Sequence, residues 1–365
     1  MKDVQYLASY NWVEDKQPTM IVPGLYYDCP SYSRLMGHTY QPDSGNTFVD
    51  QNGHRMSTGT LLPIFRAIDF MESERDEAKL DWSTVDIVTD RNNLRKLLAF
   101  AEGNDVEFRI DIQLAGSWTV LFHRWETITA ADSHGSGYGD SFERASTSPA
   151  PGCELGTLAG HYRIVTYDFA GLKLILRCEV DAYYPSKDSE IPAAKATTVT
   201  SDPMDELTGV LSSLSMANSP STTADTPRVG DDIRIVRGGA VVPQSALIKI
   251  KTRSKWNIDH FDWEFAYPQQ FIGQIPTQVI GVHHKGGFYE IREKKLDAPE
   301  LRDVARKAQE GLKKLRKILE EIHNYAMAHG KKARLSLVCK AGVLQVMQRE
   351  SADSYLPPDV LDRFE

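Results

Sequence analysis

The chain has 365 residues, 41% of them hydrophobic, which is enough to bury one large core or two smaller ones. Its net charge of -8 excludes a protein that coats nucleic acid through distributed Lys and Arg, so any nucleic-acid contact requires a local basic groove. No apolar run approaches the roughly 20 residues of a membrane helix, no signal-peptide pattern opens the chain and the four cysteines are scattered.

We therefore expect an intracellular protein, in the nucleus or the cytoplasm, without a membrane partner, a zinc site or a disulfide framework. Along the chain, residues 1–60 lack periodicity and predict an irregular wrap with short strands. The helical spacing of Leu94, Leu97 and Leu98 predicts an amphipathic helix over 92–102. Strict alternation over 108–114, continued at 118–122, predicts a β-hairpin, and the Gly- and Ser-rich stretch of about 133–158 predicts a flexible loop.

The second half of the chain alternates strands and helices. Ser, Thr, Asp and Pro dominate residues 185–230, which predicts a disordered insertion. An apolar stripe that begins after Pro299 predicts a long helix ending at Gly330. Together the patterns predict one mixed α/β domain over 1–365 with a docking tail at 355–365. A further helix is predicted at 259–273, and strands are predicted at 161–181, 246–252, 277–282, 287–292, 334–338 and 343–347.

Two charged pairs stand on predicted strands. Glu179 and Asp181 are two residues apart, as are Lys249 and Lys251, so each pair points to one face of its strand. Metal-dependent nucleases of the PD-(D/E)XK kind hold Mg²⁺ and a nucleophilic water with an acidic residue on one strand and Glu-x-Lys on the next. The alternative is that these residues form a solvated strand edge.

A series of segments, in order along residues 85–295, resembles the DXO/Rai-type family of RNA 5′-end decapping exonucleases. That family carries Gly-aromatic-x-aromatic-Glu, Glu-x-Asp and Glu-x-Lys motifs. The matching segments are Thr89 to Leu98 (TDRNNLRKLL), Trp125-Glu126-Thr127, His161 to Tyr167 (HYRIVTY), Glu179-Val180-Asp181, Leu247 to Ser254 (LIKIKTRS), Ala266 to Pro276 (AYPQQFIGQIP) and Val279 to Glu293 (VIGVHHKGGFYEIRE).

The resemblance implies mixed central β-sheets flanked by helices, in the PD-(D/E)XK-like DXO fold. It also implies removal of noncanonical 5′ ends from RNA and 5′-to-3′ degradation with two divalent ions. By position, Glu179 and Asp181 are implied to bind metal and Lys251 to face the scissile phosphate. Arg91 is implied to contact the RNA end and Gln269 the RNA backbone. Glu126, at the end of the predicted hairpin, is implied to belong to the same site.

The chain departs from the family at two positions. Lys249 stands where Glu-x-Lys begins, and Val165 stands where the Gly-aromatic motif ends in Glu, with His161 in place of its Gly. Asp168 lies three residues from Val165, on the opposite face of a strand, and does not substitute for that Glu.

These departures change the charge of the site. Glu179 and Asp181 facing Lys249 and Lys251 are neutral without an ion. A lysine about 4 Å from a metal repels each of its two positive charges by roughly 4 kcal/mol at an effective dielectric near 20. We therefore predict a metal-free, salt-bridged centre with no cofactor; the alternative is that Lys249 bends outward and one Mg²⁺ or Mn²⁺ is bound.

Basic residues extend from this centre and could line a channel for single-stranded RNA, or form a solvated edge. They are Lys249, Lys251, Arg253 and Lys255 with Arg91, Arg95 and Lys96, and Trp256 or Tyr267 would stack on bases. The first hypothesis is an RNA 5′-end-binding pseudoenzyme that works alone or with a partner, a 5′–3′ exoribonuclease or another protein. The alternatives are an active Mg²⁺- or Mn²⁺-dependent decapping hydrolase and a protein-binding scaffold.

Overall fold

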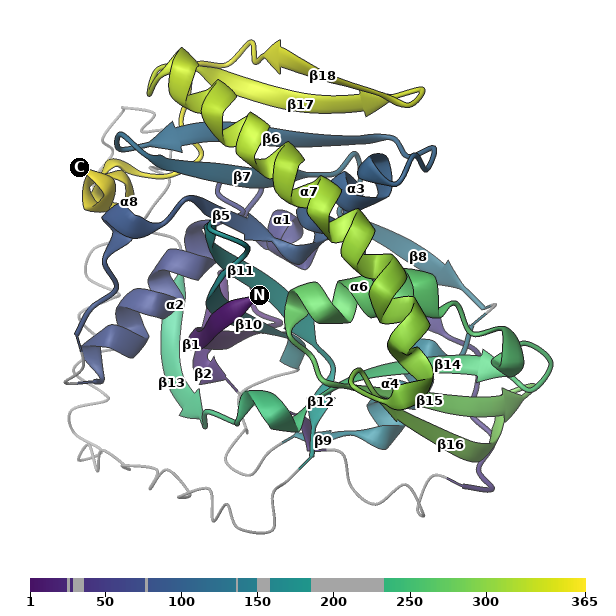
Figure 1. Ribbon diagram of the computed structural model, residues 1–365. Helices are drawn as coiled ribbons and strands as arrows, with labels where there is room; N and C mark the ends of the chain where they lie inside the picture. The colour runs from purple at the N-terminus through teal and green to yellow at the C-terminus, as the bar shows by residue number, and fades with distance from the viewer. Residues whose placement is uncertain (25–26, 29–35, 76–77, 136, 150–157, 185–232) are drawn as a thin grey trace, which may run out of the picture.

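The structure is a computed structural model that describes residues 1–24, 27–28, 36–75, 78–135, 137–149, 158–184 and 233–365. Two large mixed sheets with helices around them form the molecule, as Figure 1 shows, which confirms the predicted mixed α/β class. The ten-stranded sheet has the order β13 (Arg234–Gly239), β2 (Thr19–Gly24), β1 (Lys2–Val13), β10 (Leu158–Asp168), β11 (Lys173–Val180), β5 (Ile87–Asp90), β7 (Thr119–Trp125), β6 (Phe108–Ala115), β17 (Arg334–Lys340) and β18 (Val343–Gln348).

The second sheet is smaller. Its six strands have the order β16 (Gly287–Lys295), β15 (Thr277–His284), β14 (Leu247–Ser254), β12 (Ala182–Tyr183), β3 (Tyr27–Asp28) and β9 (Ser148–Pro149). A separate pair joins β4 (Ser44–Phe48) and β8 (Ala130–His134). The helices are α1 (Gln51–Arg55), α2 (Leu62–Ser73), α3 (Arg91–Ala101), α4 (Gly139–Ser146), α6 (Trp263–Gly273), α7 (Arg302–His329) and α8 (Pro358–Leu361).

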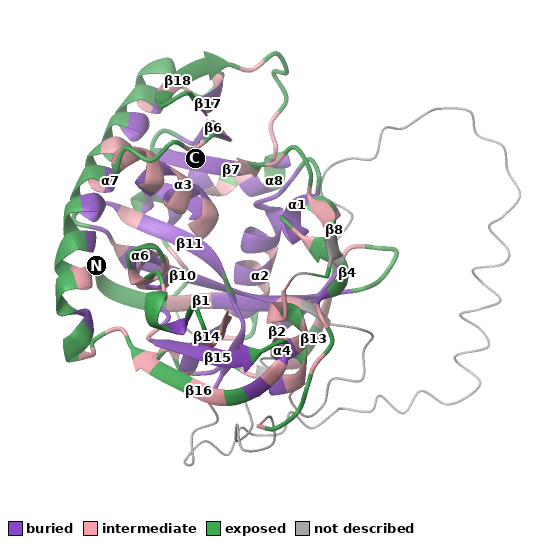
Figure 2. Ribbon diagram, turned by 90° about the vertical axis from the view of Figure 1, so that its right-hand side faces the viewer, coloured by how far each residue is buried: buried purple, intermediate pink, exposed green. Residues whose placement is uncertain are grey.

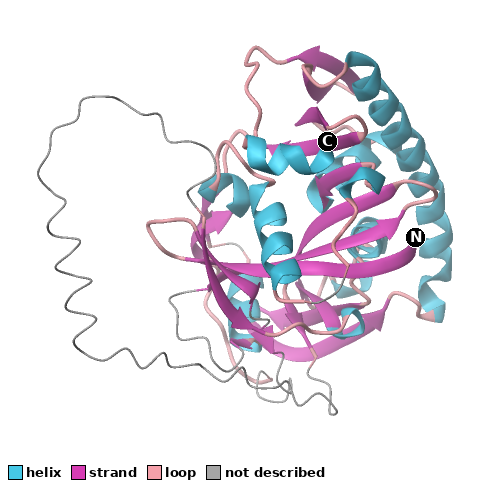
Figure 3. Ribbon diagram, turned by 90° about the vertical axis from the view of Figure 1, so that its left-hand side faces the viewer, coloured by secondary structure: helices cyan, strands magenta, loops and turns pink. Residues whose placement is uncertain are grey.

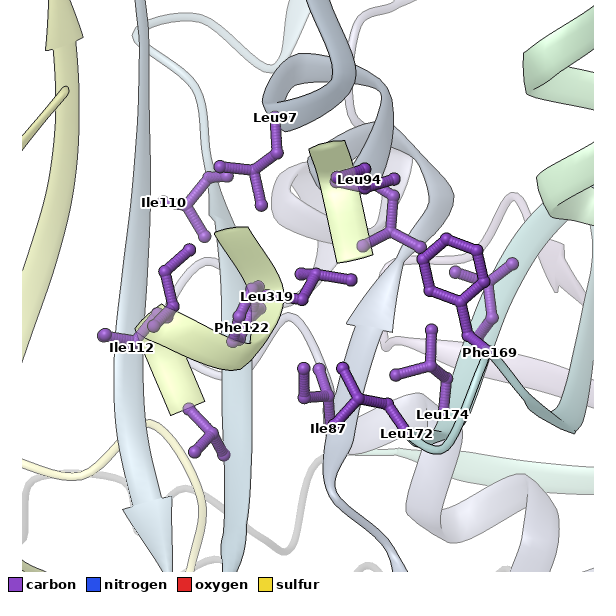
Figure 4. Close-up of a cluster of buried hydrophobic side chains, with 14 of the residues drawn as sticks. Ile87, Leu94, Leu97, Ile110, Ile112, Phe122, Phe169, Leu172, Leu174 and Leu319 are labelled. Atoms are coloured by element: carbon purple, nitrogen blue, oxygen red, sulfur yellow. The ribbon is translucent and has the colours of Figure 1, made fainter. Parts of the chain in front are cut away.

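Helices cover both faces of the ten-stranded sheet (Figure 3). On one face α3 and α7 press an apolar cluster against the central strands, where Leu94 and Leu319 meet Ile110 and Phe122 (Figure 4). The outward side of α7 is exposed while the strands beneath it are buried, as Figure 2 shows, which is the arrangement that its apolar stripe predicts. On the other face, a second cluster packs α2 against β1, β2 and the C-terminal Phe364.

Several predicted elements are confirmed. The structure has α3 at 91–101, the β6–β7 hairpin, and a turn of 3₁₀ helix at Pro299–Leu301 leading into α7, which ends before Gly330. The prediction of an irregular wrap with short strands at the N-terminus is wrong for β1, a twelve-residue strand paired with β10 and β2. Residues 8–13 are buried on both faces of β1, so the period-2 pattern of a half-buried strand is not present in the sequence.

The predicted loop over 133–158 contains α4, so that prediction is wrong over 139–146. Asp43 accepts hydrogen bonds from the backbone N–H of Gly139 (2.8 Å) and of Ser141 (2.9 Å), which satisfies the free donors of the first turn. The buried ring of Phe142 stacks on Phe288 at 4.2 Å between centroids. Tertiary contacts therefore hold this helix. Residues 150–157 and all of the predicted insertion at 185–230 lie outside the described residues.

No helix in the described part of the chain combines the length and the apolar character that a membrane span requires.

Candidate functional site

A cleft of about 620 Å³ opens where the chain passes from one large sheet to the other. β11 ends at Val180 in the ten-stranded sheet, Asp181 follows, and Ala182 already pairs with Ile248 of β14 in the six-stranded sheet. The crossover therefore brings the end of β11 next to Lys249. Charged residues of both signs line the cleft: Asp90, Arg91, Arg95, Arg124, Asp140, Glu143, Arg144, Arg177, Glu179, Asp181, Lys249 and Lys251.

Asp181 and Lys249 form a buried ion pair at the centre of the cleft. The Lys249 Nζ donates to Asp181 Oδ1, and the backbone N–H of Ile250 donates to Asp181 Oδ2 at 2.7 Å. Asp181 is 5% exposed and Lys249 is 9% exposed. Burial opposes the charge of Lys249, but attraction to Asp181 and Glu179 outweighs it and raises the pKa of the ammonium group. Both oxygens of Asp181 are therefore occupied by donors of the protein.

The other members of the two predicted pairs, Glu179 and Lys251, are exposed on the walls of the same cleft. The positive charge of Lys249, together with partial burial, lowers the pKa of Lys251. The structure thus brings all four residues of the two charged pairs together in one cleft.

A third carboxylate, Glu143 on α4, lies in the cleft and is absent from the sequence prediction. Burial raises its pKa well above the usual range, and repulsion from Asp181 and Glu179 adds to the effect. A sequence signal existed: Gly139-Asp140-Ser141-Phe142-Glu143 has the Gly, the second aromatic residue and the final Glu of the family's Gly-aromatic-x-aromatic-Glu pattern. The sequence does not predict this helix, because its polar, Gly-rich surroundings are typical of a loop.

Val165 does not stand at the position of a lost carboxylate, and that prediction is wrong. Its side chain is fully buried in the cluster between the ten-stranded sheet and α3 and α7, away from the cleft. Asp168 caps a turn by accepting from the N–H of Gly171 (2.8 Å) and does not line the cleft. His161 does line it, and its Nδ1 lies 2.9 Å from Asn11 Oδ1.

The residues present do not fit a resident divalent ion. Within the described ranges, no three His, Cys, Asp or Glu residues are grouped so that they could hold a metal. The reason is visible at Asp181, where the Lys249 ammonium group and a backbone N–H take the two oxygens that an ion would need. Lys249 therefore places an ammonium group among the carboxylates of Glu143, Glu179 and Asp181.

Three cations that line the cleft have no carboxylate partner in the described ranges. In the part of the chain that the structure describes, no ion pair links Arg91, Arg95 or Lys251 to a carboxylate. Burial lowers the pKa of Arg95, and the nearby charges of Arg124 and Arg91 lower it further, which reflects crowding of like charges. Such a group of cations is suited to an anionic ligand, because a bound anion offsets the repulsion between the positive charges.

The remaining predicted residues fall in three places. Gln269 lines the cleft with Arg91 and Lys249. Glu126 lies behind it and accepts from Lys96 Nζ and Arg124 Nε, both at 2.8 Å, so it holds Arg124 in place. Arg253 lies outside the cleft lining, with its guanidinium 5.2 Å from the centre of the Phe261 ring.

Of the two aromatic residues predicted to stack on bases, Tyr267 cannot do so. It is 6% exposed and packs parallel to Phe271, so this prediction is wrong, whereas Trp256 is 72% exposed.

A buried network that the sequence prediction missed forms the floor of the cleft. Arg177 donates from Nε to Asp90 Oδ1 (2.6 Å), from Nη2 to Asp90 Oδ2 (2.8 Å) and from Nη1 to the Tyr10 hydroxyl (3.0 Å). The Tyr10 hydroxyl in turn donates to Asn52 Oδ1 (2.6 Å). Asp90 directly precedes α3, so the network fixes the start of the helix that carries Arg91. The signal in the sequence is an arginine within the apolar run of β11.

Comparison with known proteins agrees with this architecture. A family model described as "Domain of unknown function (DUF8563)" matches residues 1–364. The structure is similar to S. pombe Rai1 (15% identity, 95% of each chain covered, TM-score 0.52) and to Scheffersomyces stipitis Rai1 (12% identity, 99% of this chain and 96% of that chain, TM-score 0.59). It is also similar to Candida albicans Rai1 in complex with pU5-Mn²⁺ (11% identity, 100% and 96% covered, TM-score 0.56). No curated protein matches this chain in sequence. At these identities the similarity establishes the fold, which is the Rai-type fold that the motifs implied.

Proposed function

We propose that this chain, which belongs to the family described as a domain of unknown function (DUF8563), binds the 5′ end of RNA in this cleft and has weak or no hydrolytic activity. The observation that carries the proposal is that Arg91, Arg95 and Lys251 line the cleft without a carboxylate partner in the described ranges, beside the ion pair between Lys249 and Asp181. A volume of about 620 Å³ is within the range of small-molecule sites and accommodates a terminal nucleotide.

Each residue has a physical role in this proposal. Arg91 and Arg95 bind terminal phosphate oxygens, since guanidinium groups form bidentate hydrogen bonds with phosphate. Lys251, exposed beside Lys249, binds the next phosphate, and Gln269 donates to the RNA backbone. Lys249 supplies a positive charge that is part of the protein itself, and Asp181 holds this charge in position.

Hydrolysis by a two-metal mechanism needs an ion to lower the pKa of the attacking water. Lys249 occupies the acceptor that such an ion requires, so the proposed protein retains the ligand and does not cleave it. A protein that holds an RNA 5′ end without cleaving it is suited to act with a partner, a 5′–3′ exoribonuclease or another RNA-processing protein.

One observation favours a second function, that of an active Mg²⁺- or Mn²⁺-dependent decapping hydrolase. Glu143 joins Glu179 and Asp181 as a carboxylate that interacts with Lys249 in the cleft. If Lys249 moves away from Asp181, these three groups become free to bind one ion.

The test measures binding and cleavage of the same RNA. Fluorescence anisotropy follows RNAs with 5′-monophosphate, 5′-triphosphate, unmethylated cap or NAD ends, in EDTA and in Mn²⁺. We expect binding in EDTA to equal binding in Mn²⁺ within about twofold, and no released nucleotide. Loss of one charge-assisted contact in Arg91→Ala weakens binding by roughly 10- to 100-fold. Arg302→Ala, on the exposed side of α7, is the matched control and leaves binding unchanged.

Three outcomes separate the candidate functions. Metal-independent binding without turnover supports the proposed binder. Robust turnover in Mn²⁺ that Asp181→Ala abolishes identifies the hydrolase. No RNA affinity even at low salt, where phosphate contacts are strongest, identifies a protein-binding scaffold.

A further inference from the structure

A basic and aromatic surface continues from the cleft along β14. Lys249 and Lys251 line the cleft, and Arg253 follows two residues later on the same face of the strand. Lys255 and Trp256 come directly after the strand ends at Ser254. Trp256 is 72% exposed, so its indole ring is accessible for stacking.

The helix α6 runs back along this surface, because it connects the parallel strands β14 and β15. Its Gln270 side chain donates to Gln278, which in turn donates to the carbonyl of Lys249 at 2.9 Å, so α6 is tied to the strand at the cleft. Gln269 faces the cleft, and Phe265 lies one turn earlier on the same side of the helix. Phe265 is 58% exposed, so a second bare ring lies beyond the cleft.

Cations and aromatic rings are held together on this surface. The Lys255 Nζ lies 4.5 Å from the centre of the Trp256 ring, and the Arg253 guanidinium lies 5.2 Å from the centre of the Phe261 ring. Both cations remain without a carboxylate partner in the described ranges. Proteins that bind single-stranded nucleic acid without sequence preference combine these two features, a positively charged path and aromatic rings for base stacking.

The nearby acidic side chains do not cancel this charge. Asp259 pairs with Arg292 (3.1 Å) and Glu264 pairs with Lys307. Asp262 accepts from the N–H of Phe265 (2.9 Å) and caps α6. Each of these carboxylates therefore has a partner of its own.

We infer that Lys251, Arg253, Trp256 and Phe265 form an exit track for the nucleotides that follow the 5′ end of a single-stranded RNA. This inference rests on the proposed function in that the terminal nucleotide occupies the cleft. The strand rises about 10 Å from Lys251 to Ser254, and the turn that carries Trp256 extends the path, so the track holds about three or more stacked nucleotides. The track reads no sequence, because every base offers a face for stacking.

The experiment measures the affinity of the full chain for 5′-phosphorylated oligouridylates of 2, 4, 6, 8 and 10 nucleotides in EDTA. We expect the affinity to rise from 2 to about 6 nucleotides and then to level off. In the double variant Trp256→Ala, Phe265→Ala, affinity for the 8-mer falls about tenfold or more, whereas affinity for the 2-mer is unchanged. Oligoadenylates show the same length dependence.

Tyr325→Ala is the matched control, since Tyr325 is an exposed aromatic residue on α7 that packs on His329. It leaves the affinity for every length unchanged. If the double variant binds the 8-mer as tightly as the wild type, the track is overturned while binding of the 2-mer still supports the cleft as the 5′-end site. If no oligonucleotide binds at all, the proposed function fails, and the exit track fails with it.

Discussion

Lys249 determines whether Glu143, Glu179 and Asp181 can bind a metal ion from solution. Its ammonium group lies where the resemblance implies a metal-binding carboxylate, and it pairs with Asp181. The pKa of Glu143 is raised by burial and by its acidic neighbours, so this group holds its proton to higher pH than an ordinary Glu. Lys249 and Lys251 thus place two positive charges beside Glu179 and Asp181.

Lys249→Glu removes one of these positive charges and leaves four acidic groups together, with Glu143, Glu179 and Asp181. Without metal, we expect this variant to unfold about 1–3 kcal/mol more easily than the wild type, because the carboxylates repel one another and Asp181 loses its partner. Mn²⁺ restores the loss by binding the folded state, and a thermal melt at increasing Mn²⁺ measures it. The wild type gains no stability from the same additions.

Lys255→Glu is the control, since it makes the same charge change next to the strand but outside the cleft. A wild type that Mn²⁺ stabilises as strongly as the variant contradicts the metal-free centre.

Buried hydrogen bonds between side chains join the elements around the cleft. Arg177 on β11 contacts Asp90 at the end of β5 and Tyr10 on β1, and Tyr10 contacts Asn52 on α1. Attraction to Asp90 and Tyr10 more than offsets the cost of burial and raises the pKa of Arg177. Arg177 therefore keeps its positive charge in the buried network.

Arg177→Met leaves Asp90 as a buried carboxylate without its counter-charge, so we expect a loss of about 3–5 kcal/mol in the free energy of unfolding. Urea denaturation measures this change. Lys313→Met, which breaks an exposed pair with Glu310 on α7, is the control and gives no measurable change. Equal midpoints for Arg177→Met and the wild type show that the network contributes no stability.

The helix α4 depends on one glycine of a neighbouring strand. A Cβ at Gly281 of β15 would lie 2.8 Å from the Phe142 ring, closer than such atoms approach in folded proteins. The bare backbone of Gly281 thus makes room for Phe142, and Phe142 places Glu143 in the cleft.

The ten-stranded sheet buries a histidine that ties the stability of the whole molecule to pH. His123 on β7 lies opposite Asp111 of β6 and under the ring of Tyr355 from the C-terminal tail, 4.5 Å between centroids. Neither of its ring nitrogens has a hydrogen-bond partner among the described residues. Burial lowers the pKa of His123 from 6.5 to about 3.

This shift predicts the direction of the pH dependence. Below pH 6.5 the unfolded chain takes up a proton at His123, and the folded protein does not until pH about 3. The free energy of unfolding therefore falls as the pH drops from 6.5 toward 3, by up to about 1.4 kcal/mol per pH unit from this residue. Buried His161, whose pKa is also lowered, acts in the same direction. Urea titrations between pH 7 and 5 measure the slope, before most carboxylates titrate.

His123→Phe removes its share and gives a shallower slope, while the exposed His260→Phe does not. Parallel slopes for the wild type and His123→Phe count against this assignment.

Local pattern was enough to predict the elements whose burial follows their own sequence. The helix α3, the β6–β7 hairpin and the long α7 each have one apolar face, and side-chain periodicity identifies such a face without knowledge of its partner. The spacing of Glu179 and Asp181, and of Lys249 and Lys251, predicted only that each pair points to one side, and the family resemblance implied that the two pairs meet.

Tertiary structure alone decided which other residues join them. Glu143 reaches the cleft on a helix held by Asp43 and Phe288, residues about 100 positions before it and 145 after it. Long-range packing also buries Tyr267 against Leu301 and Ala308 and encloses both faces of β1. The sequence by itself determined the elements and the central charges, because those depend on neighbours a few residues apart. The composition of the cleft depends on the crossover at Asp181 between two sheets, and such pairings between distant segments leave no periodic trace in the chain.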